Sequence, residues 1–177
     1  MSNLVAHVDG GSLGNPGPSG IGVVLDRSEG PTIRIAKWIG RQDNNVAEYV
    51  ALLEALHCAL ALKARKLHVY SDSEVVVRQM NGEYLCRSPR LYSLHWICRK
   101  LARSLDFSIS HIRREGNTEA NRLANSAVRE NLSQPSSIHQ IYLLEREENL
   151  PGNRLRRTIC DLQLRTSGPC DDASFPI

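Results

Sequence analysis

Alternating and helical patterns of apolar residues cover the first part of the chain. Short apolar runs predict strands at residues 4–9, 21–25, 32–39, 67–70 and 107–112. Longer segments with apolar residues every three or four positions predict helices at about 46–63, 75–80, 89–104 and 118–128. The first three strands follow one another directly, which indicates an antiparallel meander, whereas the later strands alternate with helices, which indicates parallel pairing. The pattern therefore predicts an α/β fold with a five-stranded mixed sheet flanked by helices.

The connection after the first strand is rich in turn-forming residues. The segment 10–18 contains four glycines and two prolines, so we predict that all of it is a loop. It lacks the Gly-Lys-Ser/Thr ending of a P-loop, which makes it a weak candidate for a nucleotide-phosphate cradle. In the following helix, Asn45 and Glu48 are three positions apart, which is the spacing of a capping box.

The character of the sequence changes after Asn131. Ser, Gln, Pro, Asn and Gly interrupt short apolar pieces such as 141–144, without a repeat or a low-complexity tract. We therefore predict one domain over residues 1–130 and a mostly irregular C-terminal extension over residues 131–177. The extension is a docking arm, a linker or a disordered segment, and its Arg154, Arg156 and Arg157 are expected to be solvated.

Composition and charge limit the classes of protein to which this chain can belong. The net charge is +3; residues 1–130 carry 17 basic and 13 acidic residues, whereas residues 131–177 carry 5 and 6. The mildly basic front part is compatible with a polyanionic partner. The five cysteines are odd in number and widely spaced without a C-x-x-C, which argues against a disulfide framework or a zinc knuckle and for a cytoplasmic protein. We expect neither a signal peptide nor a membrane span, because no long apolar run is present.

Three acidic residues are predicted to lie near the edge of the sheet at which α/β proteins usually bind ligands. Asp9 and Asp72 follow the first and fourth strands, and Glu48 lies in the first turn of the long helix. If the two strands are parallel neighbours, their carboxylates meet at the same sheet edge. Converging carboxylates repel one another unless a cation lies between them, and Mg²⁺ prefers oxygen ligands. Each acid taken alone is explained as well by turn or helix capping, so the prediction depends on the set.

Four motifs in order make the chain resemble type 1 ribonuclease H over residues 4–128. They are the loop that begins Asp9-Gly10-Gly11-Ser12, the helix start Asn44-Asn45-Val46-Ala47-Glu48-Tyr49, the strand end Tyr70-Ser71-Asp72-Ser73, and the segment from His111 to Asn125. The chain passes from Tyr84-Leu85-Cys86 straight to Ser88-Pro89, so it resembles the compact members without a basic protrusion.

The resemblance implies the activity and the residues that carry it. It implies two-metal hydrolysis of the RNA strand of an RNA–DNA hybrid, with Mg²⁺ as the two ions and Mn²⁺ as a substitute. We expect the protein to act as a monomer on this hybrid and to bind no membrane. The implied metal-binding and catalytic positions are Asp9, Glu48, Asp72 and Asn121. The implied nucleic-acid-binding positions are Gly10, Gly11, Asn15, Arg41, Asn44, Asn45 and Ser73.

Two positions depart from the family pattern. The family has an Asp where this chain has Asn121, so one negative charge is lost and the second metal site is weakened. Three explanations stay open: an attenuating natural change, a natural change compensated by Glu115 or Glu119, or a deliberate substitution that keeps binding without cleavage. Asp43 replaces a Thr that helps to hold a DNA phosphate and would repel this group. The alternative function is therefore a hybrid-binding module of the same fold with weak or no cleavage.

Overall fold

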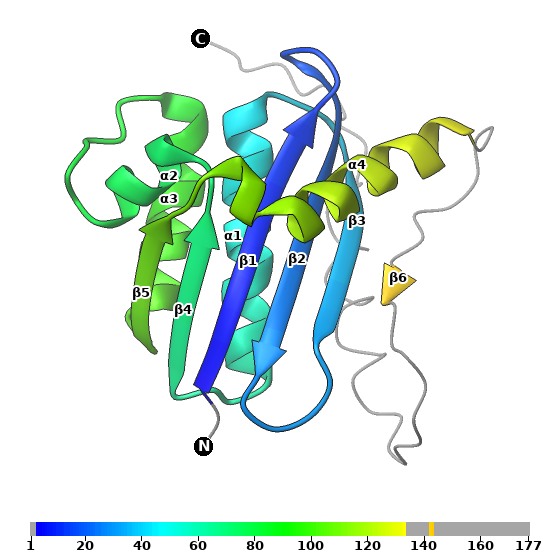
Figure 1. Ribbon diagram of the computed structural model, residues 1–177. Helices are drawn as coiled ribbons and strands as arrows, with labels where there is room; N and C mark the ends of the chain where they lie inside the picture. The colour runs from blue at the N-terminus through cyan, green and yellow to red at the C-terminus, as the bar shows by residue number, and fades with distance from the viewer. Residues whose placement is uncertain (1–2, 134–141, 144–177) are drawn as a thin grey trace, which may run out of the picture. The chain divides into compact units, whose positions relative to one another are not determined.

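The computed structural model describes residues 3–133 and 142–143, which form one sheet with helices on its two faces (Figure 1). The strands are β1 (Asn3–Ser12), β2 (Gly17–Arg27), β3 (Ile33–Gln42), β4 (Lys66–Ser71), β5 (Asp106–His111) and β6 (Tyr142–Leu143). The helices are α1 (Asn44–Ala61), α2 (Glu74–Met80), α3 (Pro89–Ala102) and α4 (Thr118–Ser133), with a short 3₁₀ turn at Arg114–Gly116. All predicted strands and helices are present, and α4 runs five residues further than expected.

The sheet is mixed, as predicted, with the strand order β5-β4-β1-β2-β3-β6. The β1, β2 and β3 strands form the antiparallel meander, whereas β4 pairs in parallel with β1 on one side and with β5 on the other. The expected five strands are joined by β6, a two-residue strand antiparallel to β3 that the sequence pattern did not indicate. Because β1 and β4 are parallel neighbours, their C-terminal ends lie at the same edge of the sheet.

Two apolar layers hold the helices to opposite faces of the sheet (Figure 1). The larger layer joins β1, β2 and β4 to α1 and α3, and Tyr49 and Leu52 of α1 are fully buried in it. The smaller layer joins Val24 of β2 to Leu123 and Ala127 of α4. Because side chains alternate along a strand, neighbouring residues of β2 serve both layers. The sheet is therefore covered on both faces around β1 and β2.

The glycine-rich segment is mostly strand, so the prediction of a loop over residues 10–18 was wrong. Gly10 pairs with Ile21 and Gly11 with Gly20 in the antiparallel ladder, and the turn is confined to residues 13–16. The Leu13 backbone N–H donates to the Pro18 carbonyl oxygen at 2.8 Å, which closes the turn. Pairing with β2 thus overrides the weak local strand preference of these glycines.

The first turn of α1 begins earlier than the sequence pattern suggested. Asp43 is the N-cap, because its Oδ1 accepts a hydrogen bond from the Val46 backbone N–H at 2.9 Å. The prediction of a capping box from Asn45 to Glu48 was therefore wrong, since both residues already lie within the helix. Glu48 therefore does not cap α1, and its carboxylate can reach the edge of the sheet.

Some predictions concern residues outside the described part of the chain. Most of the predicted extension, including Arg154, Arg156 and Arg157, lies there, as do Cys160 and Cys170. Cys58, Cys86 and Cys98 are free thiols. Within residues 3–133 and 142–143, no helix has the length and apolar character needed to cross a membrane.

Candidate metal and nucleic-acid site

The parallel register of β1 and β4 brings the two aspartates together. The last pair of this ladder is Val8 with Ser71, so Asp9 and Asp72 are each one residue further along neighbouring strands. Asp9 is only 3% exposed, and Asp72 is half-buried. The predicted meeting at the carboxyl ends of these strands is therefore confirmed.

Glu48 reaches the same point from the first turns of α1. Its Oε2 accepts a hydrogen bond from the Gly10 backbone N–H at 3.2 Å, and the residue is 6% exposed. Gly10 is required for this approach, because a Cβ at that position would collide with the backbone of Ala47 and Glu48. The glycine that the sequence suggested as part of a loop thus allows the helix to lie against β1.

The three carboxylates form one compact acidic cluster. One oxygen from each of Asp9, Glu48 and Asp72 lies within 4.8 Å of the others. Burial, followed by repulsion from Asp72, raises the pKa of Asp9 from 3.8 to about 7. Burial and the charges of Asp9 and Asp72 also raise the pKa of Glu48 well above its usual value. Buried oxygens that repel one another form a donor set suited to a hard divalent cation.

Arg114 is a functional candidate that the sequence analysis missed. It lies in the 3₁₀ turn before α4, and its charge lowers the pKa values of both Asp9 and Glu48, against the larger effects of burial and repulsion. The three carboxylates are therefore partly compensated by a cation from a distant segment. A basic residue in an exposed loop has no sequence signal of its own, because most such residues are simply solvated.

The α4 helix places Asn121 beside the cluster. Gly22, the β2 partner of Asp9, allows this approach, since a Cβ there would collide with the Ala120 carbonyl oxygen. The Asn121 Nδ2 donates to Asp9 Oδ2 at 3.3 Å. The fourth predicted site residue is thus at the expected place, but it presents a donor rather than an oxygen to Asp9.

The two acids considered as substitutes for the missing carboxylate differ in position. Glu119 accepts a hydrogen bond from Arg34 Nε at 2.7 Å, so its charge is paired with β3. Glu115 is exposed and lines an open pocket of about 470 Å³ together with Glu48 and Asp72. Glu119 is therefore directed to β3, whereas Glu115 shares the pocket with Glu48 and Asp72.

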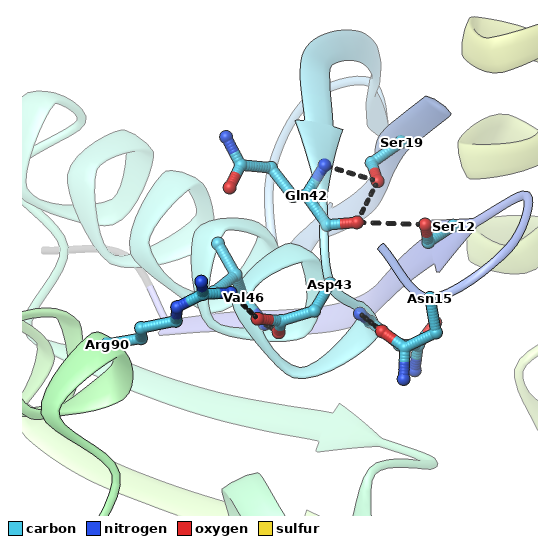
Figure 2. Close-up of polar contacts among 8 residues, drawn as sticks. Ser12, Asn15, Ser19, Gln42, Asp43, Val46 and Arg90 are labelled. Atoms are coloured by element: carbon cyan, nitrogen blue, oxygen red, sulfur yellow. Dashed lines mark hydrogen bonds and ion pairs between the residues drawn. The ribbon is translucent and has the colours of Figure 1, made fainter. Parts of the chain in front are cut away.

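Asn15, one of the predicted nucleic-acid positions, lies where the β1–β2 turn meets the start of α1 (Figure 2). Asn15 Oδ1 accepts from the Asn44 backbone N–H at 3.1 Å, which ties the turn to the helix. The Ser12 and Ser19 hydroxyls both donate to the Gln42 carbonyl oxygen, at 3.0 and 3.1 Å. These bonds fix the relative positions of two segments that are about thirty residues apart in the chain.

The remaining candidates surround this junction. Asn44 and Ser73 line the open pocket with Glu48 and Asp72, as does His111, whose Nε2 lies 3.3 Å from the Asp72 carbonyl oxygen. Arg41 and Asn45 are exposed, at the end of β3 and in the first turn of α1, and Gly11 is in the β1–β2 ladder. Three separate segments, 44–48, 72–73 and 111–115, supply the residues that line the pocket.

Asp43 is engaged by two partners. Besides capping α1, its Oδ2 lies 3.7 Å from Arg90 Nη1 at the start of α3 (Figure 2). The acid that was expected to repel a phosphate thus has a cation close to it in the folded domain. Arg90 itself is exposed and faces solvent beside this junction.

The mixed sheet, the helices on both faces and the acidic cluster at the edge of β1 and β4 define a ribonuclease H-like domain. Residues 7–127 match the protein family described as reverse transcriptase-like. The chain belongs to this family and, by its relatives and structural neighbours, to type 1 ribonuclease H. The expected compact form agrees with the direct passage from α2 to α3.

Three relatives illustrate the similarity. The chain is 37% identical over 125 residues to ribonuclease HI of Halobacterium salinarum, covering 70% of this chain and 63% of that protein. The N-terminal RNase H domain of rv2228c from Mycobacterium tuberculosis has a TM-score of 0.71 at 37% identity, covering 75% of this chain and 97% of that structure. LC11-RNase H1, solved in complex with an RNA/DNA hybrid, has a TM-score of 0.68 at 36% identity, covering 74% and 100%. The chain spans only 35% of the full-length mycobacterial protein Rv2228c.

Proposed function

We propose that this domain is an endonuclease that hydrolyses the RNA strand of RNA–DNA hybrids with the help of divalent metal ions. The observation that carries the proposal is the compact cluster of Asp9, Glu48 and Asp72, with oxygens within 4.8 Å of one another. The similarity to LC11-RNase H1, which was solved with an RNA/DNA hybrid, supports the choice of substrate. The cluster provides the negative charge that metal binding needs. The substrate class is inferred from the similarity to members of the family.

The donor set fits Mg²⁺, because it offers hard oxygens and up to three negative charges. We propose that Asp9, Glu48 and Asp72 hold the metal, that Mn²⁺ can substitute, and that cleavage uses two ions. Ions held by these residues would supply Lewis-acid chemistry, polarising a phosphodiester and making a water more acidic. The hydrogen bond from Gly10 keeps Glu48 oriented towards this position. Arg114 reduces the cost of holding three acids together before the metal arrives.

The neighbouring polar residues are proposed to hold the nucleic acid. Asn44 and Ser73 share the open pocket with Glu48 and Asp72, and Asn15 is tied to Asn44. Amide and hydroxyl groups that share this pocket suit the 2′-hydroxyls that separate RNA from DNA. Arg41, Asn45 and the backbone at Gly10 and Gly11 complete the proposed surface, with Arg41 as the phosphate contact.

We propose that Asn121 attenuates cleavage, because it removes a negative charge from the flank of Asp9. The second candidate function, a hybrid-binding module with little or no cleavage, is favoured by one observation: the Asn121 side chain turns its Nδ2 to Asp9 at 3.3 Å. A donor at that position cannot coordinate a cation. The two functions differ only in whether the remaining three acids suffice for the reaction.

The test uses an RNA–DNA hybrid labelled on the RNA strand, with Mg²⁺ and then Mn²⁺. The proposed enzyme cuts the RNA to products with 3′-hydroxyl ends, and Asp9→Asn abolishes the cutting. Binding of the hybrid without product in either metal supports the binding module. Neither binding nor product at moderate salt contradicts both and would indicate a protein-interaction domain, for which Asp9→Asn leaves the function intact. Double-stranded DNA of the same sequence is the substrate control.

A further inference from the structure

Two asparagines one turn apart on α4 form a chain of hydrogen bonds that ends at the acidic cluster. The Asn125 Nδ2 donates to the Asn121 backbone carbonyl at 2.9 Å and to Asn121 Oδ1 at 3.0 Å. The Asn121 Nδ2 in turn donates to Asp9 Oδ2 at 3.3 Å. Residues four apart on a helix lie on the same face, so this arrangement is built into α4.

The two ends of the chain determine how both amides are oriented. The Asn121 backbone carbonyl can only accept, so the Asn125 atom beside it must be the nitrogen. That nitrogen also faces the Asn121 side chain, which therefore turns its oxygen towards Asn125. The remaining Asn121 nitrogen faces Asp9, whose carboxylate accepts. Reversing the Asn121 amide would place a donor against a donor at one end and an oxygen against a carboxylate oxygen at the other.

This orientation removes position 121 from the set of metal ligands. An amide can bind a hard cation through its oxygen but not through its NH₂ group. The oxygen of Asn121 accepts from Asn125, and it is the NH₂ group of the same amide that is directed towards Asp9. Asn121 is therefore not simply a weaker oxygen ligand than an aspartate. It donates a hydrogen bond to Asp9 and offers no oxygen on the side of Asp9 where a second ion would lie.

We propose that Asn125 is a positioning residue that holds Asn121 with its NH₂ group towards Asp9, so that position 121 does not ligate metal in this protein. The inference deepens the proposed function and rests on it, because it concerns which residues bind metal at the same site. It also supplies a specific variant, since an acid at position 125 offers only acceptors. In Asn125→Asp, the carboxylate is repelled by the Asn121 backbone carbonyl and moves to accept from the Asn121 NH₂ group, so that the Asn121 amide oxygen turns towards Asp9.

The experiment measures Mn²⁺ binding to the whole chain at pH 8, above the pKa of about 7 of Asp9, so that this carboxylate is an acceptor. Binding is followed without nucleic acid, by isothermal titration calorimetry or by the loss of the electron paramagnetic resonance signal of free Mn²⁺. We expect Asn121→Ala to bind Mn²⁺ within about twofold of the parent protein, because no ligand is removed. Asn125→Asp is expected to bind about five- to tenfold more tightly, an effect of the size that neighbours of metal ligands produce. The double variant Asn125→Asp/Asn121→Ala controls for the added charge and is expected to lose this gain.

Each other outcome overturns the inference. A tenfold or larger loss in Asn121→Ala identifies Asn121 as a ligand. An unchanged Mn²⁺ affinity in Asn125→Asp would show that Asn125 does not orient the Asn121 amide. A gain in affinity that persists in the double variant would show that the added charge alone causes it. Ser126→Ala, which loses a 2.9 Å hydrogen bond to Leu123 on the same helix, is the control for helix stability. Hybrid cleavage is measured separately. If the Mn²⁺ results are as expected but no cleavage occurs, only the proposed nuclease function is refuted. If no variant binds Mn²⁺, the proposed function and this inference are both refuted.

Discussion

Asn117 holds Asp72 to the first strand of the sheet. Its Nδ2 donates to Asp72 Oδ1 at 3.1 Å and to the Val8 carbonyl oxygen at 2.8 Å, and the residue is 1% exposed. One amide group therefore joins the end of β1, the end of β4 and the segment that leads into α4. Its Oδ1 is buried without a hydrogen-bond partner among the described residues, so only the NH₂ group of this side chain contributes hydrogen bonds.

Asn117→Ala is predicted to destabilise the domain and to weaken metal binding together. The Val8 carbonyl loses a buried donor, which costs about 1–3 kcal/mol, and Asp72 loses the group that orients it. Thermal unfolding and Mn²⁺ titration measure the two effects. Asn117→Asp is the matched variant: it has nearly the same shape but no donor and adds a charge beside Asp72. An affinity for Mn²⁺ unchanged in Asn117→Ala would contradict the orienting role.

Gly10 and Gly11 are neighbours with opposite tolerance of a side chain. A Cβ at Gly10 collides with the backbone of Ala47 and Glu48, whereas a Cβ at Gly11 meets nothing within 4 Å. Gly10→Ala is therefore predicted to push α1 from β1 and to lower stability by about 2–3 kcal/mol, the usual cost of overpacking. Gly11→Ala is expected to change stability by less than about 0.5 kcal/mol. Denaturant unfolding of the two variants makes the comparison, and equal losses would contradict the proposed close contact.

The metal-free domain is predicted to lose stability as the pH rises. The pKa of Asp9 in the folded state is about 7, above its usual 3.8, so the folded protein holds this proton more tightly than the unfolded chain. The resulting stabilisation is complete below about pH 4 and is lost as the pH passes through about 7. The raised pKa of Glu48 acts in the same direction.

Asp9→Asn measures this contribution. In a chelator at pH 8 it is expected to raise the melting temperature by about 5 °C, which corresponds to about 1–2 kcal/mol, and to change little at pH 4. Mg²⁺ added to the parent protein is expected to stabilise it at pH 8 and hardly at pH 4, where protons occupy the carboxylates. A melting temperature at pH 8 that falls on Asp9→Asn would contradict the cost assigned to the ionised cluster.

Asn121→Asp is predicted to raise the rate of hybrid cleavage at least about tenfold, because it adds a carboxylate beside Asp9 in place of a donor. The same substitution at Asn131, an exposed residue later in α4, adds an equal charge away from the cluster and serves as the control. Initial rates in saturating Mg²⁺ measure the change. If Asn121→Asp leaves the rate at the parent level, the attenuation assigned to Asn121 is wrong.

Local pattern identified most of the fold, and the three acids were identified as a set at strand and helix ends together with the resemblance in four motifs. Alternation and helical spacing depend on neighbours in the chain, so the strands ending at Asp9 and Asp72 and the helix carrying Glu48 were predictable. The same local rules failed at Gly10 and Gly11, where pairing with β2 decides the conformation, and at Asn45, where the cap lies two residues earlier at Asp43.

The tertiary structure alone decided the relations between segments far apart in the chain. Arg34 pairs with Glu119 across 85 positions, and Asn121 reaches Asp9 across 112, so neither relation leaves a periodic signal. The direction of the Asn121 amide depends on partners at both ends of a hydrogen-bond chain. The sequence by itself determined which groups are present and on which elements they lie. Their protonation, orientation and pairing were decided by burial and by close packing through Gly10 and Gly22, because these act only once the chain has folded.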